Sequence, residues 1–217
     1  KMSSILILSA MLMTAAPPAD KDIKEEVFSI ALGMSSKQYV KMPPTAGDMV
    51  WQATINCRHS KKKGAEHTDL LWQLTEIEED WQVPIDYTGM LLASACHESG
   101  FNRFAKGDFS KKGHARAIGL FQLWPWWVKR YKIDRTNPEA SANAYLQHIA
   151  RQLPKVKKNC KFRSKNRLWR AAWVHAIRFP KKGGRCYETT KHERLLNRWK
   201  RNIRKHRRQE IREMDDC

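Results

Sequence analysis

Apolar residues recur at intervals of three and four positions along most of this chain, so helices must supply most of its core. Leu70, Leu71, Leu74 and Ile77 give residues 65–82 one apolar face, and such a face has to pack against another element. Further helices are expected at residues 22–35, 86–99, 125–131, 138–153, 166–177 and 188–213. Residues 101–116, rich in Gly, Lys, Asp and Ser, predict a loop or a small irregular β region. The pattern predicts a mostly α fold with one small irregular or β central lobe.

The chain is strongly basic, with 41 Lys and Arg against 22 Asp and Glu and a formal net charge of +19. Small soluble domains usually carry a net charge of about 2–8. The excess indicates a polyanionic partner or, alternatively, a surface that is only heavily solvated. Nucleic acid, an anionic membrane surface and an acidic cell-wall polymer all fit this charge. No apolar run reaches the length of a membrane-spanning helix, so we expect no transmembrane segment.

The N-terminal residues have the pattern of a secretory signal peptide. Lys1 precedes an apolar run at residues 5–16, and small residues and prolines follow it. We therefore expect residues 1–19 to be a signal peptide and the protein to be exported to the periplasm, the cell envelope or the medium. A phage-associated protein also fits this expectation. The alternative is a short buried helix at the N-terminus. Residues 20–65 are an extension of unknown role, and residues 204–217 are a basic C-terminal tail.

Five cysteines fit an oxidising compartment. Cys160 and Cys186 flank a basic segment that contains tryptophans, and they are the favoured disulfide pair. Cys96 is expected to be a small buried residue on a helix. The chain has no Cys-x-x-Cys, and its eight histidines do not fall at zinc-ligand spacings. We expect no metal and no cofactor.

One carboxylate lies where carboxylates are rarely found. A helix is expected to run from Asp86, its N-cap, to Gly100, and Glu98 lies at the end of its apolar stripe. Desolvation and the helix C-terminus both disfavour the charged form. A protonated glutamate is the state that a general acid needs. The alternative interpretation is a structural Glu98 paired with Arg103 or Arg116.

The residues around Glu98 resemble a known family. The segment Glu98-Ser99-Gly100-Phe101-Asn102, followed further along by Gly119-Leu120-Phe121-Gln122-Leu123-Trp124-Pro125, resembles the motifs of lytic transglycosylases. Trp81-Gln82-Val83-Pro84 upstream and Glu188-Thr189 downstream are similar to the same family, so the resemblance covers roughly residues 66–203. It implies a lysozyme-like catalytic domain with two lobes, a saccharide cleft between them and peptidoglycan as the substrate.

The resemblance also implies roles for single residues. Glu98 would be the catalytic acid/base, Ser99 would support the site by hydrogen bonding, and Gln122 would line the cleft beside the sugar. The third motif of the family, Ala-Tyr-Asn-Ala-Gly, is matched only loosely at residues 172–176. There Trp173 replaces the Tyr and His175 takes the polar position, so both are expected to contact substrate.

In the resembled family a single Glu cleaves the bond between MurNAc and GlcNAc and leaves a 1,6-anhydro sugar, without consuming water. Ordinary glycoside hydrolysis uses two carboxylates. Asp108 is the candidate for a second one, and with it the enzyme would be a muramidase like the goose-type lysozymes, which are related in fold and hydrolyse with water. The alternative is that Asp108 is a turn residue after Gly107.

Tryptophans cluster at Pro125, just after Gln122. We expect Trp124 nearest the sugar and at least one of Trp126 and Trp127 in the core.

Two rival functions remain. The first is a non-enzymatic polyanion binder, although no helix-turn-helix or RNP-type signature occurs and no nucleic acid is expected. The second is membrane disruption by the basic C-terminal helix.

Overall fold

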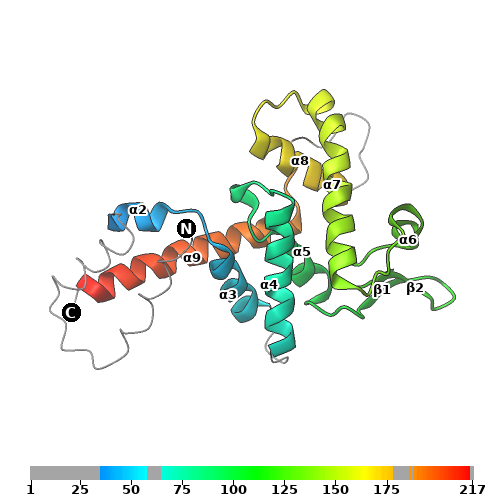
Figure 1. Cartoon of the computed structure of the whole chain (residues 1–217), viewed down its shortest axis with the longest axis horizontal. Coiled ribbons are helices and arrows are strands. Elements are labelled where there is room, and N and C mark those ends of the chain that lie inside the picture. Colours follow the sequence, from blue (N-terminus) through cyan, green and yellow to red (C-terminus); the bar gives the residue numbers. More distant parts are fainter. Residues whose placement is uncertain (1–34, 58–64, 178–185, 187, 216–217) are drawn as a thin grey trace, which may run out of the picture. The chain divides into compact units, whose positions relative to one another are not determined.

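The computed structural model describes residues 35–57, 65–177, 186 and 188–215 (Figure 1). The chain divides into two units, one of residues 43–203 and one of residues 1–42 with 204–217. The first unit contains every residue discussed below as part of a site. The expected signal peptide lies outside the described residues, and so does the expected helix at 22–35 apart from Ser35.

The described part of the chain is mostly helical with one small two-stranded sheet, as the sequence predicts. Its helices are α2 (Ser36–Lys41), α3 (Ala46–Asn56), α4 (Ala65–Asp80), η2 (Ile85–Tyr87, a 3-10 helix), α5 (Met90–Ser99), α6 (Pro125–Tyr131), α7 (Pro138–Cys160), α8 (Lys165–Ile177) and α9 (Lys191–Asp215). Its strands are β1 (Lys106–Phe109) and β2 (Ala115–Ile118), which pair antiparallel with Lys106 opposite Ile118. The hairpin occupies the region expected to be irregular.

Most predicted helices within the described residues are confirmed with small shifts at their ends, whereas α7 is longer than predicted and α3 is additional. Helix α7 continues beyond the predicted end at Leu153 and contains Pro154. Val156 and Cys160 beyond the proline are buried, and their packing offsets the hydrogen bond that proline removes. Helix α3 was not predicted, because the prolines before it indicate a break. Thr45 nevertheless starts this helix, since it forms a reciprocal capping box with Asp48.

The helix predicted from Asp86 is wrong at its start. Asp86 lies in η2 and bonds the side chain of Asn166, whereas α5 begins at Met90 after Gly89. The carboxylate of Glu78 accepts the backbone N–H groups of Gly89 at 2.6 Å and Leu91 at 2.5 Å. A carboxylate from α4 therefore does what an N-cap side chain does in other helices.

Helix α5 lies at the centre of the core. All six residues from Met90 to Ala95 are buried. The helix contacts α3 and α4, α4 contacts α7, and α7 packs along α8 (Figure 1). The end of α5 is thus the one part of this helix where a polar side chain can reach solvent.

Within the described residues two disulfides form, Cys57–Cys96 and Cys160–Cys186. The second is the pair that the sequence favours. Cys96 lies on a helix as expected, but it is only partly buried and is bonded to Cys57, 39 residues upstream. Nothing in the local pattern shows a partner so distant. The Cys57–Cys96 bond ties the last turn of α5 to the end of α3.

Candidate active site

Glu98 lies in the last turn of α5, between core and solvent. The helix ends at Gly100, which adopts a left-handed conformation with φ 59°, a geometry that glycine tolerates best. The Glu98 side chain is 30% exposed, although the turns before it are buried. Its carboxylate can therefore meet a ligand from solvent while its backbone is held by the core.

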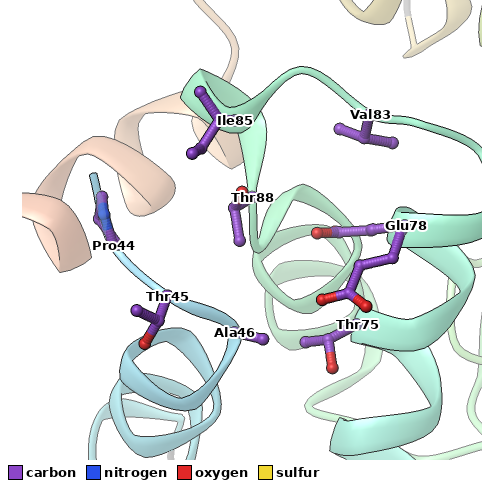
Figure 2. A pocket seen from close by; sticks show the side chains of 9 residues that line it. Pro44, Thr45, Ala46, Thr75, Glu78, Val83, Ile85 and Thr88 are labelled. Atoms are coloured by element: carbon purple, nitrogen blue, oxygen red, sulfur yellow. The ribbon is translucent and has the colours of Figure 1, made fainter. Parts of the chain in front are cut away.

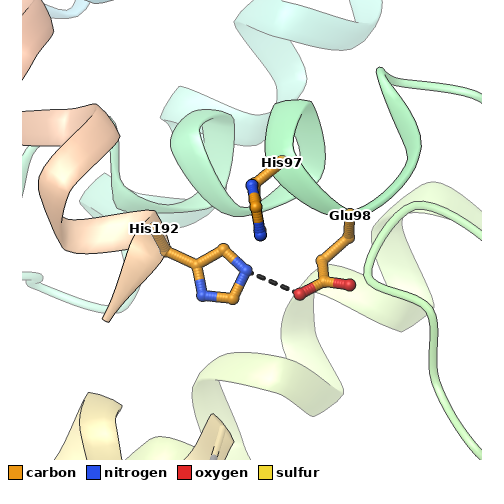
Figure 3. A group of neighbouring side chains, drawn as sticks. All are labelled: His97, Glu98 and His192. Carbon is orange, nitrogen blue, oxygen red and sulfur yellow. Dashed lines mark hydrogen bonds and ion pairs between the residues drawn. The ribbon is translucent and has the colours of Figure 1, made fainter.

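The partner of Glu98 is His192, at the start of α9 (Figure 3). His192 Nε2 lies 2.6 Å from Glu98 Oε1. Thr190 fixes the entry to α9, because its hydroxyl accepts the backbone N–H of Glu193. No pairing of Glu98 with Arg103 or Arg116 occurs in the described residues, so that alternative is wrong in its choice of partner.

His192 is held from behind by buried aromatic side chains. Only 3% of the residue is exposed, and its ring stacks on Trp173 with centroids 6.3 Å apart. Trp173 Nε1 donates to the Tyr145 hydroxyl at 3.1 Å, and that hydroxyl lies 3.3 Å from the hydroxyl of Ser94. Burial raises the pKa of Tyr145, so its hydroxyl stays protonated. The network links α5, α7 and α8 behind the carboxylate.

The hydrogen bonding favours one tautomer of His192. Its Nδ1 is buried and has no hydrogen-bond partner among the described residues. A buried N–H without an acceptor costs about 1–3 kcal/mol. The ring is therefore best placed with its proton on Nε2, where it donates to Glu98.

A second histidine completes the cluster. His97 precedes Glu98 on α5, and its ring lies 4.7 Å from that of His192 at an interplanar angle of 79°. One nitrogen of each histidine and one oxygen of Glu98 lie within 4.8 Å of one another (Figure 3). Burial lowers the pKa of His97, and the nearby His192 lowers it further. Neither histidine was predicted from the sequence as part of the site, and His192 is separated from Glu98 by 94 residues.

Two predicted site residues, Trp173 and His175, are buried, and a third, Ser99, is half-buried. Ser99 donates its hydroxyl to the carbonyl of Ala95 at 3.1 Å, one turn back, and the structure records no bond from it to Glu98. Trp173 and His175 are both buried, so neither presents a surface to substrate in this structure. Trp173 acts on the site through His192.

Gln122 fastens two loops together. It has a positive φ of 47°, and its Nε2 donates to the carbonyls of Ala105 at 3.2 Å and Gly119 at 3.0 Å. Gly107 lies directly against its side-chain oxygen, where a Cβ would overlap it. Gln122, which the resemblance places beside the sugar, thus stabilises the two ends of the hairpin.

Trp124 and Asp108 lie together. Trp124 is 40% exposed, and its Nε1 donates to Asp108 Oδ2 at 3.1 Å. The guanidinium of Arg116 lies over its ring at 5.7 Å. Trp127 is buried and stacks on Trp126, as expected for at least one of that pair. The exposed ring of Trp124 is therefore the member of the cluster open to a sugar.

A buried carboxylate that the sequence analysis overlooked lies on α4. Glu78 borders a pocket of about 300 Å³ whose walls include Thr75 and Thr88 (Figure 2). Burial raises the pKa of Glu78 to about 8, although its two backbone hydrogen bonds act in the opposite direction. Its place on the same face as Leu71 and Leu74 was the available signal. Since both oxygens already hold the start of α5, we assign Glu78 a structural role.

No family model, curated protein or solved structure matches this chain. Within the part of the chain that the structure describes, no helix is both long and apolar enough to cross a bilayer. The geometry around Glu98, together with the sequence motifs, therefore carries the functional argument.

Proposed function

We propose that this protein is a lytic transglycosylase that cleaves the glycan strands of peptidoglycan, with Glu98 as the only acid/base. The proposal includes a lysozyme-like catalytic domain over residues 66–203, with two lobes and a saccharide cleft, in an exported protein. One observation carries it: a partly exposed glutamate ends a buried helix and is bonded to a buried histidine. The motifs around Glu98 and Gln122 supply the substrate class.

The reaction needs two proton transfers, one from Glu98 and one to it. Protonated Glu98 donates to the oxygen that links C1 of MurNAc to GlcNAc, and this bond breaks as the GlcNAc hydroxyl leaves. The Glu98 carboxylate then takes the proton of the MurNAc 6-hydroxyl while that oxygen bonds to C1. The products are a 1,6-anhydro-MurNAc end and a free GlcNAc end, and Glu98 returns protonated.

His192 suits a carboxyl group that changes its protonation during a reaction. With its proton on Nε2, the ring can donate to Oε1 of the carboxylate and equally to Oε1 of the acid that carries its proton on Oε2, so the 2.6 Å contact can persist in both states. The stack on Trp173 fixes the ring while this happens. His192 is a positioning residue in this proposal, because it acts through Glu98.

A single carboxylate is favoured over a pair by the contacts that Asp108 and Glu98 make. Asp108 Oδ2 accepts the indole N–H of Trp124, and the partner of Glu98 is a histidine. Retaining and inverting hydrolases instead direct two carboxylates at one bond. Hydrolysis with water positioned by Asp108 would make the enzyme a muramidase, and the products distinguish the two.

Glu98→Gln tests the proposal. The amide keeps the size of the side chain and cannot donate and recover a proton, so release of soluble fragments from purified peptidoglycan should fall at least about a hundredfold. Glu76→Gln is the matched control, because Glu76 is exposed on α4; it should keep the wild-type rate. Full cleavage by Glu98→Gln would contradict the proposal. If the wild-type protein and Glu98→Gln both bind peptidoglycan and neither cleaves it, the protein is a non-enzymatic polyanion binder and not an enzyme.

A further inference from the structure

We propose that His97, Glu98 and His192 form a binding site for one transition-metal dication of the Zn²⁺ type, and that its binding blocks the acid/base. The blocking half rests on the proposed function, whereas the metal site itself does not. The sequence predicts no metal site, because its histidines do not fall at zinc-ligand spacings and 94 residues separate His192 from Glu98. Helix α5 supplies two of the ligands and α9 the third.

The three side chains are already turned toward one another (Figure 3). Their ligand atoms lie within 4.8 Å of one another, and atoms bound to one tetrahedral Zn²⁺ at about 2.1 Å are roughly 3.4 Å apart. Glu98 Oε1 and His192 Nε2, at 2.6 Å, must therefore separate slightly as the ion takes the place of the proton between them. That proton moves to His192 Nδ1, which is buried without an acceptor among the described residues, so binding through His192 is weaker than at a site whose histidines all have such acceptors. The movement of Glu98 is small, because no backbone has to shift for a side-chain carboxylate to turn.

The three side chains are of the types that bind Zn²⁺. Two imidazoles and one carboxylate are a common zinc set, with the remaining position open to water or a ligand. Imidazole nitrogen favours Zn²⁺, Co²⁺ and Cu²⁺ over Mg²⁺ and Ca²⁺, which prefer oxygen. His97 and Glu98 are accessible from solvent, and His192 is held by Trp173 from behind, so an ion can enter a partly preformed site.

Occupation of this site and catalysis exclude each other. The carboxylate of Glu98 that would bind the ion is the group now bonded to His192. A carboxylate bound to a dication no longer carries the proton that the glycosidic oxygen requires. A bound ion would therefore act as a reversible inhibitor whose removal by a chelator restores cleavage.

The test is a titration of the untagged full chain with Zn²⁺ by calorimetry, and with Co²⁺ by visible absorbance. We expect one ion per chain, and His97→Ala should weaken binding at least about tenfold. His97 is exposed, so this variant should fold. His114→Ala is the matched control, because His114 is exposed in the hairpin turn, and its affinity should equal that of the wild type.

The outcomes separate this proposal from the proposed function. Absence of binding, or equal loss in both variants, would overturn the metal site and leave the cleavage proposal standing. Binding that fills the site without slowing fragment release would overturn the blocking role. Binding lost only in His97→Ala, with inhibition that EDTA reverses, would support both halves. A protein that binds Zn²⁺ in this way but never cleaves peptidoglycan would refute the function and keep the site.

Discussion

At the scale of single residues, two glutamates differ in their burial and in their hydrogen-bond partners. Glu98 is partly exposed and has a histidine partner, while Glu78 is buried and bonded to two backbone amides. The sequence allows the position of Glu98 at a helix end to be predicted, since Gly100 stops the helix. His192 could not be predicted as its partner, because only the tertiary packing of α9 brings it near. The role of Glu78 could not be predicted either, because it caps another helix, α5, that only the tertiary fold brings near.

Glu78 should make the stability depend on pH. Its pKa is about 8 in the folded protein against an ordinary 4.5, so between these values the folded state holds a proton that the unfolded chain has lost. The free energy of unfolding should therefore fall as pH rises through this window, by about 1 kcal/mol per pH unit. Glu78→Gln, which has no such proton, should lack this part of the pH dependence. Urea unfolding of both proteins from pH 5 to 9 measures it, and identical slopes would contradict the assignment.

At the scale of elements, helices with a clear apolar face were predictable and helix starts were less so. The apolar spacing of α4 and α8 and the proline at the start of α6 were sufficient signals. The start of α5 was not, because η2 and Gly89 intervene and the cap comes from α4. The hairpin of β1 and β2 was expected only as an irregular region, since its strands are short and mostly exposed.

Gly89, directly before α5, is an element boundary sensitive to substitution. Its φ is 85°, and a Cβ there would overlap the side chain of the fully buried Met49. Gly89→Ala should cost about 1–2 kcal/mol from the left-handed backbone alone, and more from the overlap. Gly113→Ala is the control, because Gly113 has a φ of 78° with open space around it. Urea unfolding should show the larger loss for Gly89→Ala, and equal losses would contradict the packing described here.

At the scale of the whole molecule, the net charge of +19 should act through attraction to an anionic substrate. Charge of this size raises the local concentration of a protein on a polyanion, and salt screens the effect. Fragment release should therefore slow between about 0.01 M and 1 M salt, over which the Debye length falls from about 30 Å to about 3 Å. Peptidoglycan freed of anionic wall polymer should show a weaker dependence. A rate that is the same at both salt concentrations on both substrates would contradict this role of the charge.

The most direct measurement is mass spectrometry of the products that the protein releases from purified peptidoglycan. The account predicts MurNAc ends in the 1,6-anhydro form, one water lighter than reducing ends, and their absence with Glu98→Gln. Asp108→Asn should still give anhydro ends, because Asp108 takes no part in the proton transfers. Reducing MurNAc ends that depend on Glu98 would contradict the transglycosylase and identify a hydrolase, with Asp108 the first candidate to position the water.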